Sequence, residues 1–508
     1  MLDRYVKKIN EADFCGVVCQ TSLQKAPQLS AKTGRTVLLK REDQQSVFSF
    51  KIRGAANKIR SLDEVQKQAG VITASAGNHA QGVAVAAKKF GIPATIVMPR
   101  TTPEVKVSAV RAHGANVVLF GDAFPDSLQH ALDLQAQKGM TFVHPYDDDE
   151  VIAGQGTIAK EILEQYPQDI EAIFVPVGGG GLIAGVTAWI KQMRPEIKVI
   201  GVEPEGSCCL REALVTGERV KLPQVELFAD GVAVAQVGEK PFALLKDLVD
   251  DVVLVSVDEI CAAAWDVFGD TRTIPEPAGA LSVAGIKRYV ERQEEQASGA
   301  LVAIISGANV DSDRVRYMAE RISIGQKREI LMSVGLPERP GALLEFCRTL
   351  NGFGITEFNY RYANDQKAQI LVGLRVQDYA TDSARILSQL AAKGFDAMDL
   401  TDNDLVKEHI RHMVGGRPPC PLNEVLYSFI FPERPGALLS FLEKMPPGWN
   451  ISLFHYRCLG ASHGRVLMGL QVPLEDRAQI RKALEGGEFE GNYETANPAY
   501  GLFLGCAG

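Results

Sequence analysis

Short apolar segments alternate with amphipathic ones over the first two thirds of the chain. The apolar segments are rich in β-branched residues, as expected of strands buried on both faces. They are residues 37–40, 70–74, 94–98, 115–120, 172–175, 198–202 and 301–305. Helical patterns lie between them, as at residues 82–90, 102–113 and 152–166. From about Thr36 to Ile324 this alternation predicts an α/β fold of parallel sheets, with ligands at the carboxyl ends of the strands.

After Ile324 the pattern changes, and the sequence contains an internal duplication. The octamer Pro-Glu-Arg-Pro-Gly-Ala-Leu-Leu occurs at residues 337–344 and again at 432–439, each time between a predicted strand and a predicted helix. Residues 358–362 (FNYRY) likewise match 454–458 (FHYRC). A period of about 95 residues is too long for a solenoid. It indicates two α+β domains, each with the β-α-β-β-α-β order of a ferredoxin-like fold.

Composition and charge narrow the class of protein. With 508 residues, 46% hydrophobic and 23% charged, the chain resembles a soluble globular protein of about two to four domains. A net charge of -8 and the lack of a Lys/Arg tract argue against nucleic-acid binding. Residues 172–190 are uncharged and approach membrane-spanning length, but Pro176 and the glycines after it favour a buried strand, turn and helix. Nine scattered cysteines, and an N-terminus without the apolar core of a signal peptide, indicate a cytoplasmic protein with reduced thiols.

Two short segments in the alternating region carry the candidate chemistry. Residues 49–55 (SFKIRGA) place Lys51 where a Phe-rich loop enters an Ala-rich helix. Much later in the chain, an apolar strand runs into the four glycines 178–181 and then Leu182. A lysine can hold an aldehyde as a Schiff base, and a side-chain-free turn before a helix lets backbone N–H groups surround a phosphate. A cofactor with both groups is pyridoxal phosphate, whose chemistry the protein would orient.

Three further segments follow predicted strands or open helices, at the edge where a ligand is expected. They are residues 75–82 (SAGNHAQG), 275–280 (PEPAGA) and 306–309 (SGAN). Each alone is compatible with an ordinary turn, because Ser, Asn and Gly are common turn residues. Together with Lys51 and the glycine run, in this order, they are hard to assign to chance.

The segments SFKIRGA, SAGNHAQG, GGGGL, ADGVAV, EPAGA and SGAN resemble those of the fold-type II pyridoxal phosphate enzymes. Within that class the chain resembles the biosynthetic threonine deaminases over nearly its whole length. The resemblance implies that Lys51 is the Schiff-base lysine, that Asn78 hydrogen-bonds the cofactor's phenolic oxygen and that Ser306 lies against its pyridine nitrogen. The residues that it implies for phosphate binding are Gly178, Gly179, Gly180, Gly181 and Leu182.

The implied reaction is β-elimination from L-threonine, and also from L-serine. Lys51, displaced by the substrate's amine, would take the α-proton as a neutral amine. The β-hydroxyl then leaves, and hydrolysis gives 2-oxobutanoate and ammonia in the case of threonine. A hydroxyl at Ser306, in place of a carboxylate, makes the cofactor ring a weaker electron sink and favours elimination over transamination.

Two positions depart from the family's pattern. Its usual Thr-Pro-Leu near the start is Thr21-Ser22-Leu23 here, a minor change because no cofactor contact depends on it. Some relatives bind a divalent ion through a Glu and an Asp six residues later. Here Glu203 is followed at that spacing by Cys209, so we predict no such metal.

The duplicated tail resembles the paired ACT-like regulatory domains of the same enzymes. That resemblance implies feedback inhibition by isoleucine, activation by valine and a homotetramer. A PERPG loop at a helix start suits an amino-acid carboxylate, and strand faces around Phe358 and Phe454 would supply an apolar wall. For either copy alone, a stiff Pro-Gly turn is an equally good explanation of the loop.

The predicted boundaries are 1–324 for the pyridoxal phosphate domain, 327–402 and 423–497 for the two ACT-like domains, and 403–422 for the linker. A helix is expected near Leu405–Met413, where His409 and His412 are interpreted as packing residues because a metal site would need more ligands. Three alternatives remain: a catabolic serine/threonine dehydratase, a serine racemase, and an amino-acid sensor with an inactive catalytic half. The tandem tail argues against the first two, and the intact Lys51, glycine run and SGAN argue against the third.

Overall fold

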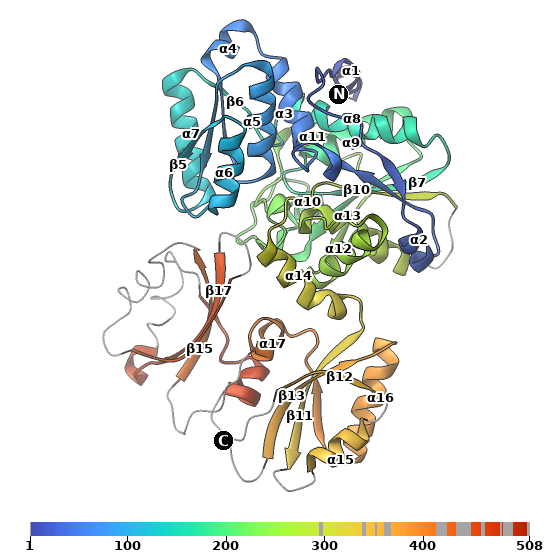
Figure 1. Ribbon diagram of the computed structural model, residues 1–508, viewed down its shortest axis with the longest axis vertical. Coiled ribbons are helices and arrows are strands. Elements are labelled where there is room, and N and C mark those ends of the chain that lie inside the picture. The colour runs from blue at the N-terminus through green and yellow to red at the C-terminus, as the bar shows by residue number, and fades with distance from the viewer. Residues whose placement is uncertain are drawn as a thin grey trace. The chain divides into compact units, whose positions relative to one another are not determined.

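A computed structural model describes residues 2–293, 298–337, 342–350, 353–359, 367–412, 424–432, 449–458, 463–477, 480 and 491–504 (Figure 1). The chain divides into two compact units, Met1–Val315 and Arg316–Gly508. Each unit is considered by itself below. In the described part of the chain, no helix combines the length and the apolar character needed to cross a membrane.

The larger sheet of the first unit has six strands in the order β1-β2-β10-β7-β8-β9. Their bounds are β1 Leu23–Lys25, β2 Val37–Arg41, β10 Ala300–Ile305, β7 Ile170–Pro176, β8 Lys198–Pro204 and β9 Asp251–Val255. All neighbours pair in parallel except β1 and β2. Every residue of β2 and β10 is buried, because helices cover both faces of a parallel sheet.

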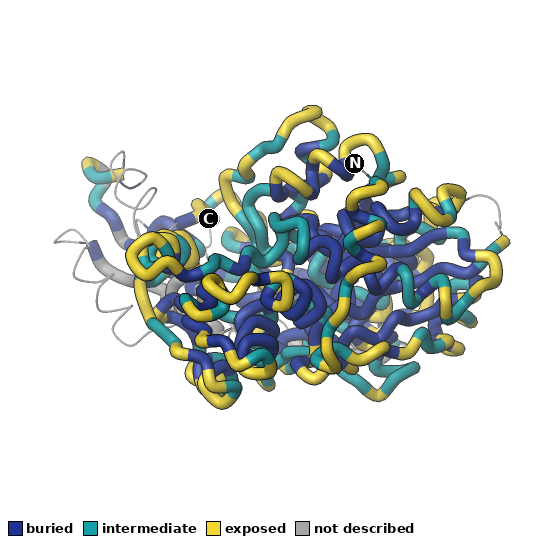
Figure 2. The backbone as a smooth tube through the Cα atoms, turned by 90° about the horizontal axis from the view of Figure 1, so that it is seen from above, coloured by how far each residue is buried: buried dark blue, intermediate teal, exposed yellow. Residues whose placement is uncertain are grey.

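Four long helices flank this sheet: α8 Asp149–Gln165, α9 Gly181–Met193, α12 Val257–Thr271 and α13 Pro277–Glu291. Apolar residues of α8 and α9 share one core with β7 and β10, while α13 packs on β7 to β10. The buried stretches of the tube lie in the interior, with exposed stretches around them (Figure 2). The uncharged segment 172–190 therefore forms a strand, a turn and a buried helix, as predicted.

A smaller parallel sheet has the order β5-β4-β3-β6. Its strands are β3 Val71–Ala74, β4 Ala94–Met98, β5 Asn116–Leu119 and β6 Thr141–Phe142, and its neighbouring helices include α3 Lys51–Arg60, α5 Asn78–Phe90, α6 Glu104–Ala112 and α7 Phe124–Lys138. Helices α3 and α5 contribute to the core on one face, and α7 packs on the other. The prediction of two parallel sheets is confirmed, although α5 begins at Asn78 and not at residue 82.

The second unit contains two four-stranded antiparallel sheets, ordered β12-β13-β11-β14 and β16-β17-β15-β18. The first copy comprises β11 Glu329–Pro337, α15 Ala342–Thr349, β12 Gly354–Asn359, β13 Lys367–Arg375, α16 Tyr379–Ala392 and β14 Asp396–Asp399. The second includes β15 Glu424–Pro432, β16 Asn450–Cys458, β17 His463–Gln471 and β18 Gly491–Tyr493. Both show a register shift at the matching place, Ile355/Glu357 and Ile451/Leu453. The duplication therefore extends to an irregularity of the strand pairing.

The predicted helix between the two copies is present as α17 Asp404–Glu408 and a following turn at Ile410–His412. Leu405 and Val406 share a core with residues of both sheets. His409 is buried, and His412 lies 3.8 Å from a carboxylate oxygen of Glu320. The helix thus helps to join the two sheets of this unit.

Candidate active site

Lys51 and Ser306 lie close together because two loops of the first unit pair with each other. Ser49 forms an antiparallel bridge with Gly307. The Phe50 N–H donates to the Ser306 carbonyl at 3.1 Å, and the Ala308 N–H donates to the Phe48 carbonyl at 2.9 Å. The segments SFK and SGAN, distant in sequence, are therefore one structural element at the start of α3.

The Lys51 amine lies near a backbone carbonyl and an aromatic ring. Its Nζ is 3.4 Å from the Pro145 carbonyl oxygen and 5.2 Å from the centroid of the Phe50 ring. Burial lowers the pKa of Lys51 to about 8, and the ionised fraction of the nearby Glu276 carboxyl offsets part of that effect. Since a pKa of 8 leaves roughly a tenth of the amine neutral at pH 7, Lys51 can act as a nucleophile or base.

Two neighbouring histidines carry no charge at neutral pH. Burial lowers the pKa of His79 to about 3 and that of His144 to about 4, and the charge of Lys51 lowers both further. His79 Nε2 is 2.9 Å from the Val143 carbonyl oxygen. The Tyr146 and Asp147 N–H groups donate to His144 Nδ1. The two rings therefore shape the site without adding cations to it.

The four glycines follow β7 and lead into α9, and each has its own steric reason. A Cβ at Gly178 would lie 2.9 Å from the Val232 backbone, and one at Gly179 would lie 2.3 Å from the Tyr146 ring. Gly181 also meets Tyr146, at 2.9 Å, while Gly180 has a φ of +91°. That φ is unfavourable for any residue with a side chain. The loop can thus exist only without side chains.

The start of α9 is a suitable place for an anion. Gly180 is its N-cap and, because it has no side chain, leaves the first N–H groups of the helix without a side-chain acceptor. The first N–H groups of a helix have no intrahelical acceptor, and the helix dipole favours negative charge there. The backbone from Gly178 to Leu182 therefore offers donors to a phosphate.

Asn78, at the first residue of α5, lies between two polar side chains from other loops. Its Nδ2 donates to Glu276 Oε1 at 2.7 Å, and its Oδ1 accepts from Asn309 Nδ2 at 2.7 Å. The segments SAGNHAQG, EPAGA and SGAN thus meet through side-chain hydrogen bonds. The structure brings Lys51, Asn78 and Ser306 into one region at the carboxyl ends of strands.

Sequence reasoning missed several residues of this region. Tyr146 packs on the glycine loop, and the buried carboxyl of Glu276 contacts Asn78. Lys106 of the smaller sheet's α6 donates to Asp230 at 3.0 Å, in the ADGVAV segment. Glu276 lies in the segment 275–280, which was selected from the sequence. Its contact with Asn78 became clear only from the structure, where the loops that carry the two residues meet. No spacing rule points to Tyr146 or Lys106.

The buried Glu203 carboxylate is engaged by backbone groups. It accepts hydrogen bonds from the Leu210 and Arg211 N–H groups at 2.8 and 2.9 Å. Burial raises its pKa to about 8 despite these bonds. In the described part of the chain, no group of three or more His, Cys, Asp or Glu side chains is placed to hold a metal ion.

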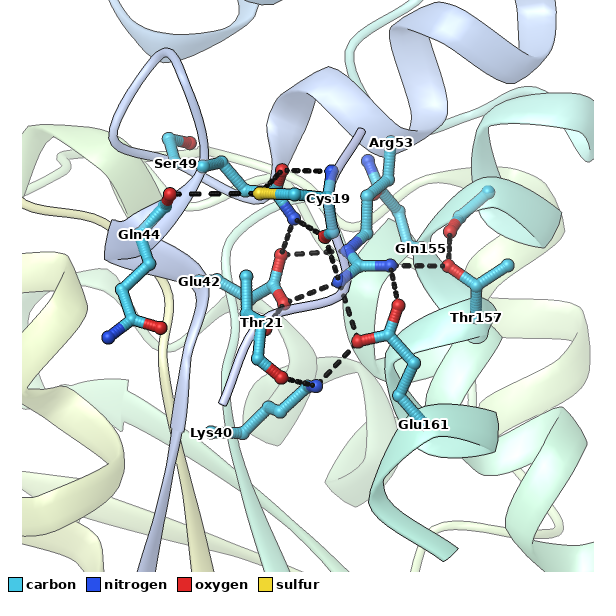
Figure 3. A network of polar contacts seen from close by, with 12 residues as sticks. Cys19, Thr21, Lys40, Glu42, Gln44, Ser49, Arg53, Gln155, Thr157 and Glu161 are labelled. Carbon is cyan, nitrogen blue, oxygen red and sulfur yellow. Dashed lines mark hydrogen bonds and ion pairs between the residues drawn. The ribbon is translucent and has the colours of Figure 1, made fainter. Parts of the chain in front are cut away.

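A charged network supports α3 immediately after Lys51 (Figure 3). The Arg53 guanidinium is fully buried and lies between two carboxylates. Glu42 accepts from it at 2.7 and 2.8 Å, and Glu161 accepts at 2.6 and 2.9 Å. Lys40 Nζ donates to Glu161 at 2.5 Å. Two cations thus balance two anions, and the network ties α3 to α8 and to the residues after β2.

Together these residues define a class of protein. A lysine with a lowered pKa fits the aldehyde of pyridoxal phosphate. A glycine cradle before a helix fits its phosphate, and an asparagine held between loops fits its phenolic oxygen. Two parallel-sheet subdomains with this arrangement are the fold-type II catalytic unit of pyridoxal phosphate enzymes. Residues 16–307 match the family of pyridoxal-phosphate dependent enzymes.

The comparisons extend the match to the second unit. Residues 320–410 and 416–504 match the C-terminal regulatory domain of threonine dehydratase. The chain is 52% identical to the biosynthetic L-threonine dehydratase IlvA of Burkholderia multivorans, over 98% of this chain and 99% of the relative. It is 46% identical to that of Escherichia coli, over 98% and 97%. The chain belongs to the biosynthetic threonine dehydratases.

Solved structures resemble the first unit. The processed form of threonine deaminase isoform 2 from Solanum lycopersicum matches with a TM-score of 0.61 and 47% identity, over 63% of this chain and 92% of that chain. Maize serine racemase matches with a TM-score of 0.58 and 34% identity, over 60% and 94%. The catalytic fold is therefore shared with enzymes of a different reaction.

Proposed function

We propose that this protein converts L-threonine to 2-oxobutanoate and ammonia, the first step of isoleucine biosynthesis. The observation that carries the proposal is that one chain joins the Lys51 site to a tail matching the threonine dehydratase regulatory domain. L-Serine, with the same β-hydroxyl, is proposed as a second substrate. A serine racemase shares the catalytic fold, so the fold alone does not distinguish the two reactions. The regulatory tail is the feature that favours threonine dehydration over racemization.

The proposal assigns a role to each site residue. Lys51 would hold the cofactor's aldehyde and, when free of it, would take the substrate's α-proton as a neutral amine; its pKa of about 8 supports this role. Asn78 would donate to the phenolic oxygen, and the N–H groups from Gly178 to Leu182 would bind the phosphate. When bound, pyridoxal phosphate supplies the electron sink for the substrate's α-carbon. The Ser306 hydroxyl would hold the pyridine nitrogen, which would favour loss of the β-hydroxyl over transamination.

Regulation belongs to the second unit in this proposal. Isoleucine is the proposed inhibitor and valine the proposed activator, with no metal ion involved. Residues 338–341 and 433–436 of the PERPG loops, together with the side chains of Phe358 and Phe454, lie outside the described residues. The matching register shifts of the two copies support a duplicated effector domain.

The remaining assignments concern domains and assembly. We propose domain boundaries at 1–324, 327–402 and 423–497 with a linker at 403–422, a homotetramer, and a cytoplasmic location. The division of the chain between Val315 and Arg316 supports a boundary in this region. The five cysteines described as free support a reducing compartment.

The test is a steady-state assay of ketoacid formation from L-threonine and L-serine, with and without isoleucine. We expect turnover of threonine that isoleucine reduces, and none in a Lys51→Ala control. Formation of D-serine without ketoacid would instead identify a racemase. Turnover that is indifferent to isoleucine would refute end-product regulation, and isoleucine binding without any turnover would identify a sensor.

A further inference from the structure

Glu276 is a buried carboxyl that the reaction proposed above does not use. It is the N-cap of α13, but its side chain makes no capping hydrogen bond with that helix. Only 4% of the residue is exposed. Its Oε1 instead accepts a hydrogen bond from Asn78 Nδ2 at 2.7 Å. A buried polar group that leaves its own helix uncapped and contacts a cofactor-site residue calls for an explanation.

The direction of the hydrogen bonds around Asn78 follows from Asn309. Asn309 Nδ2 donates to the Val47 carbonyl at 2.8 Å and to Asn78 Oδ1 at 2.7 Å. A backbone carbonyl can only accept, so this end of Asn309 must be its nitrogen, and Asn78 must turn its oxygen toward it. The nitrogen of Asn78 therefore faces Glu276. An amide nitrogen carries two hydrogens, so one N–H of Asn78 is left for a further acceptor.

The carboxyl of Glu276 is confined by two glycines. A Cβ at Gly307 would lie 2.7 Å from Oε1, and one at Gly231 would lie 3.5 Å from the same atom. Gly307 belongs to the SGAN segment and Gly231 to ADGVAV. Both loops therefore approach the carboxyl closely, which restricts its rotation and fixes the oxygen that meets Asn78.

We propose that Glu276 is a positioning residue that, together with Asn309, orients the Asn78 amide so that its remaining N–H serves the cofactor's phenolic oxygen. This inference rests on the role proposed for Asn78. Burial and the nearby Asp230 raise the pKa of Glu276 to about 8. At neutral pH the carboxyl therefore holds a proton and accepts from Asn78 without placing a second negative charge beside a phenolate.

The test measures cofactor affinity and the visible absorbance of the bound cofactor, by titrating cofactor-free protein with pyridoxal phosphate. Glu276→Gln keeps an acceptor oxygen in the same shape and should bind within about twofold of the original protein. Glu276→Ala should bind about tenfold more weakly, the equivalent of one hydrogen bond, with a shifted absorbance band. Glu171→Ala is the matched control, because Glu171 is a partly buried, hydrogen-bonded glutamate at the opposite end of β7 from the glycine loop.

A double-variant cycle separates this inference from the proposed function. If Glu276 acts through Asn78, the pair Glu276→Ala/Asn78→Ala should bind no more weakly than Asn78→Ala alone. Effects that multiply would overturn the inference, as would a Glu276→Gln protein as weak as Glu276→Ala. Normal affinity in Glu276→Ala with weakened Asn78→Ala would also overturn it, while leaving the role of Asn78 intact. Normal affinity in Asn78→Ala would refute that role itself. Should Glu276→Ala fail to fold, Asn309→Ala removes the other hydrogen bond, and unchanged affinity and absorbance there would count against the inference.

Discussion

Replacing Arg53 with methionine should destabilise the first unit by about 3–5 kcal/mol, the range found when one partner of a buried ion pair is removed. The guanidinium donates four hydrogen bonds of 2.6–2.9 Å to Glu42 and Glu161, and one of 3.1 Å to Thr157. The Glu42 side chain is completely buried. Burial raises the pKa of Glu42, but Arg53 outweighs that effect and holds the pKa below its usual value. Without Arg53, Lys40 is the one cation of this network left beside the buried Glu42 and the partly buried Glu161.

Two further variants calibrate this expectation. Arg53→Lys keeps the charge but replaces a planar fork of donors by a single ammonium, which cannot span both carboxylates. A loss of about 1–3 kcal/mol is expected, the cost of buried acceptors left unsatisfied. Arg194→Met is the matched control, since Arg194 pairs with Glu196 at the surface, where their side chains are 36% and 58% exposed. An exposed pair contributes about 0–1 kcal/mol.

Urea unfolding followed by tryptophan fluorescence measures these differences. Trp189 and Trp265 lie in the first unit and Trp449 in the second, so a Trp449→Phe background restricts the signal to the first unit. This restriction matters because a chain of two units need not unfold in one step. If Arg53→Met and Arg194→Met shifted the midpoint equally, the argument from the buried network would be refuted.

Three other predictions concern the cofactor and the tail. Gly180→Val should weaken pyridoxal phosphate affinity at least about tenfold, because of the φ of +91° and a Cβ only 2.8 Å from that of Pro241; titration of cofactor-free protein that showed unchanged affinity would contradict the phosphate role. The rate of cofactor uptake, followed by stopped-flow absorbance, should rise with pH and level off above about pH 8, since only neutral Lys51 reacts and its pKa is about 8; a flat rate from pH 6 to 8 would contradict this. A soluble fragment ending near Gly325 should keep its turnover and lose its response to isoleucine, because the coupling of about 1–3 kcal/mol typical of allostery would be removed; a fragment still inhibited by isoleucine would place the effector site in the first unit.

The sheets could be predicted where strands are buried on both faces. Strands β2, β7, β8 and β10 are almost entirely buried, and each has a neighbour on both sides in the six-stranded sheet. The strands that sequence reasoning missed are β1, β9 and β6, and all three lie at a sheet edge. β1 and β6 have only 3 and 2 residues, too few to show a period. Strand length and a central place in the sheet therefore explain most of these outcomes, although the edge strand β5 was also predicted.

The site was predictable only in part, for a related reason. Lys51 and the glycine run could be recognised in the sequence because a reactive amine and a turn without side chains are local features. Glu276 and Tyr146 act through contacts with residues far away in sequence, 198 positions in the case of Asn78. Their importance depends on how loops from different strands meet, which no local pattern encodes. A motif can therefore be singled out correctly while the residue that positions its partner is overlooked.

Cys209, the position that departs from the family's pattern, contributes to the support of the glycine loop. Both oxygens of Glu203 are occupied by N–H groups at the start of α10 (Cys209–Thr216). The Cys209 thiol lies beside them and donates to the Gly178 carbonyl at 3.4 Å. Burial and the nearby Glu203 raise the pKa of this thiol far above its usual value, so it remains a neutral donor. Glu203 thus fixes the helix start, and Cys209 joins that helix to Gly178, the first residue of the glycine loop, through a direct hydrogen bond.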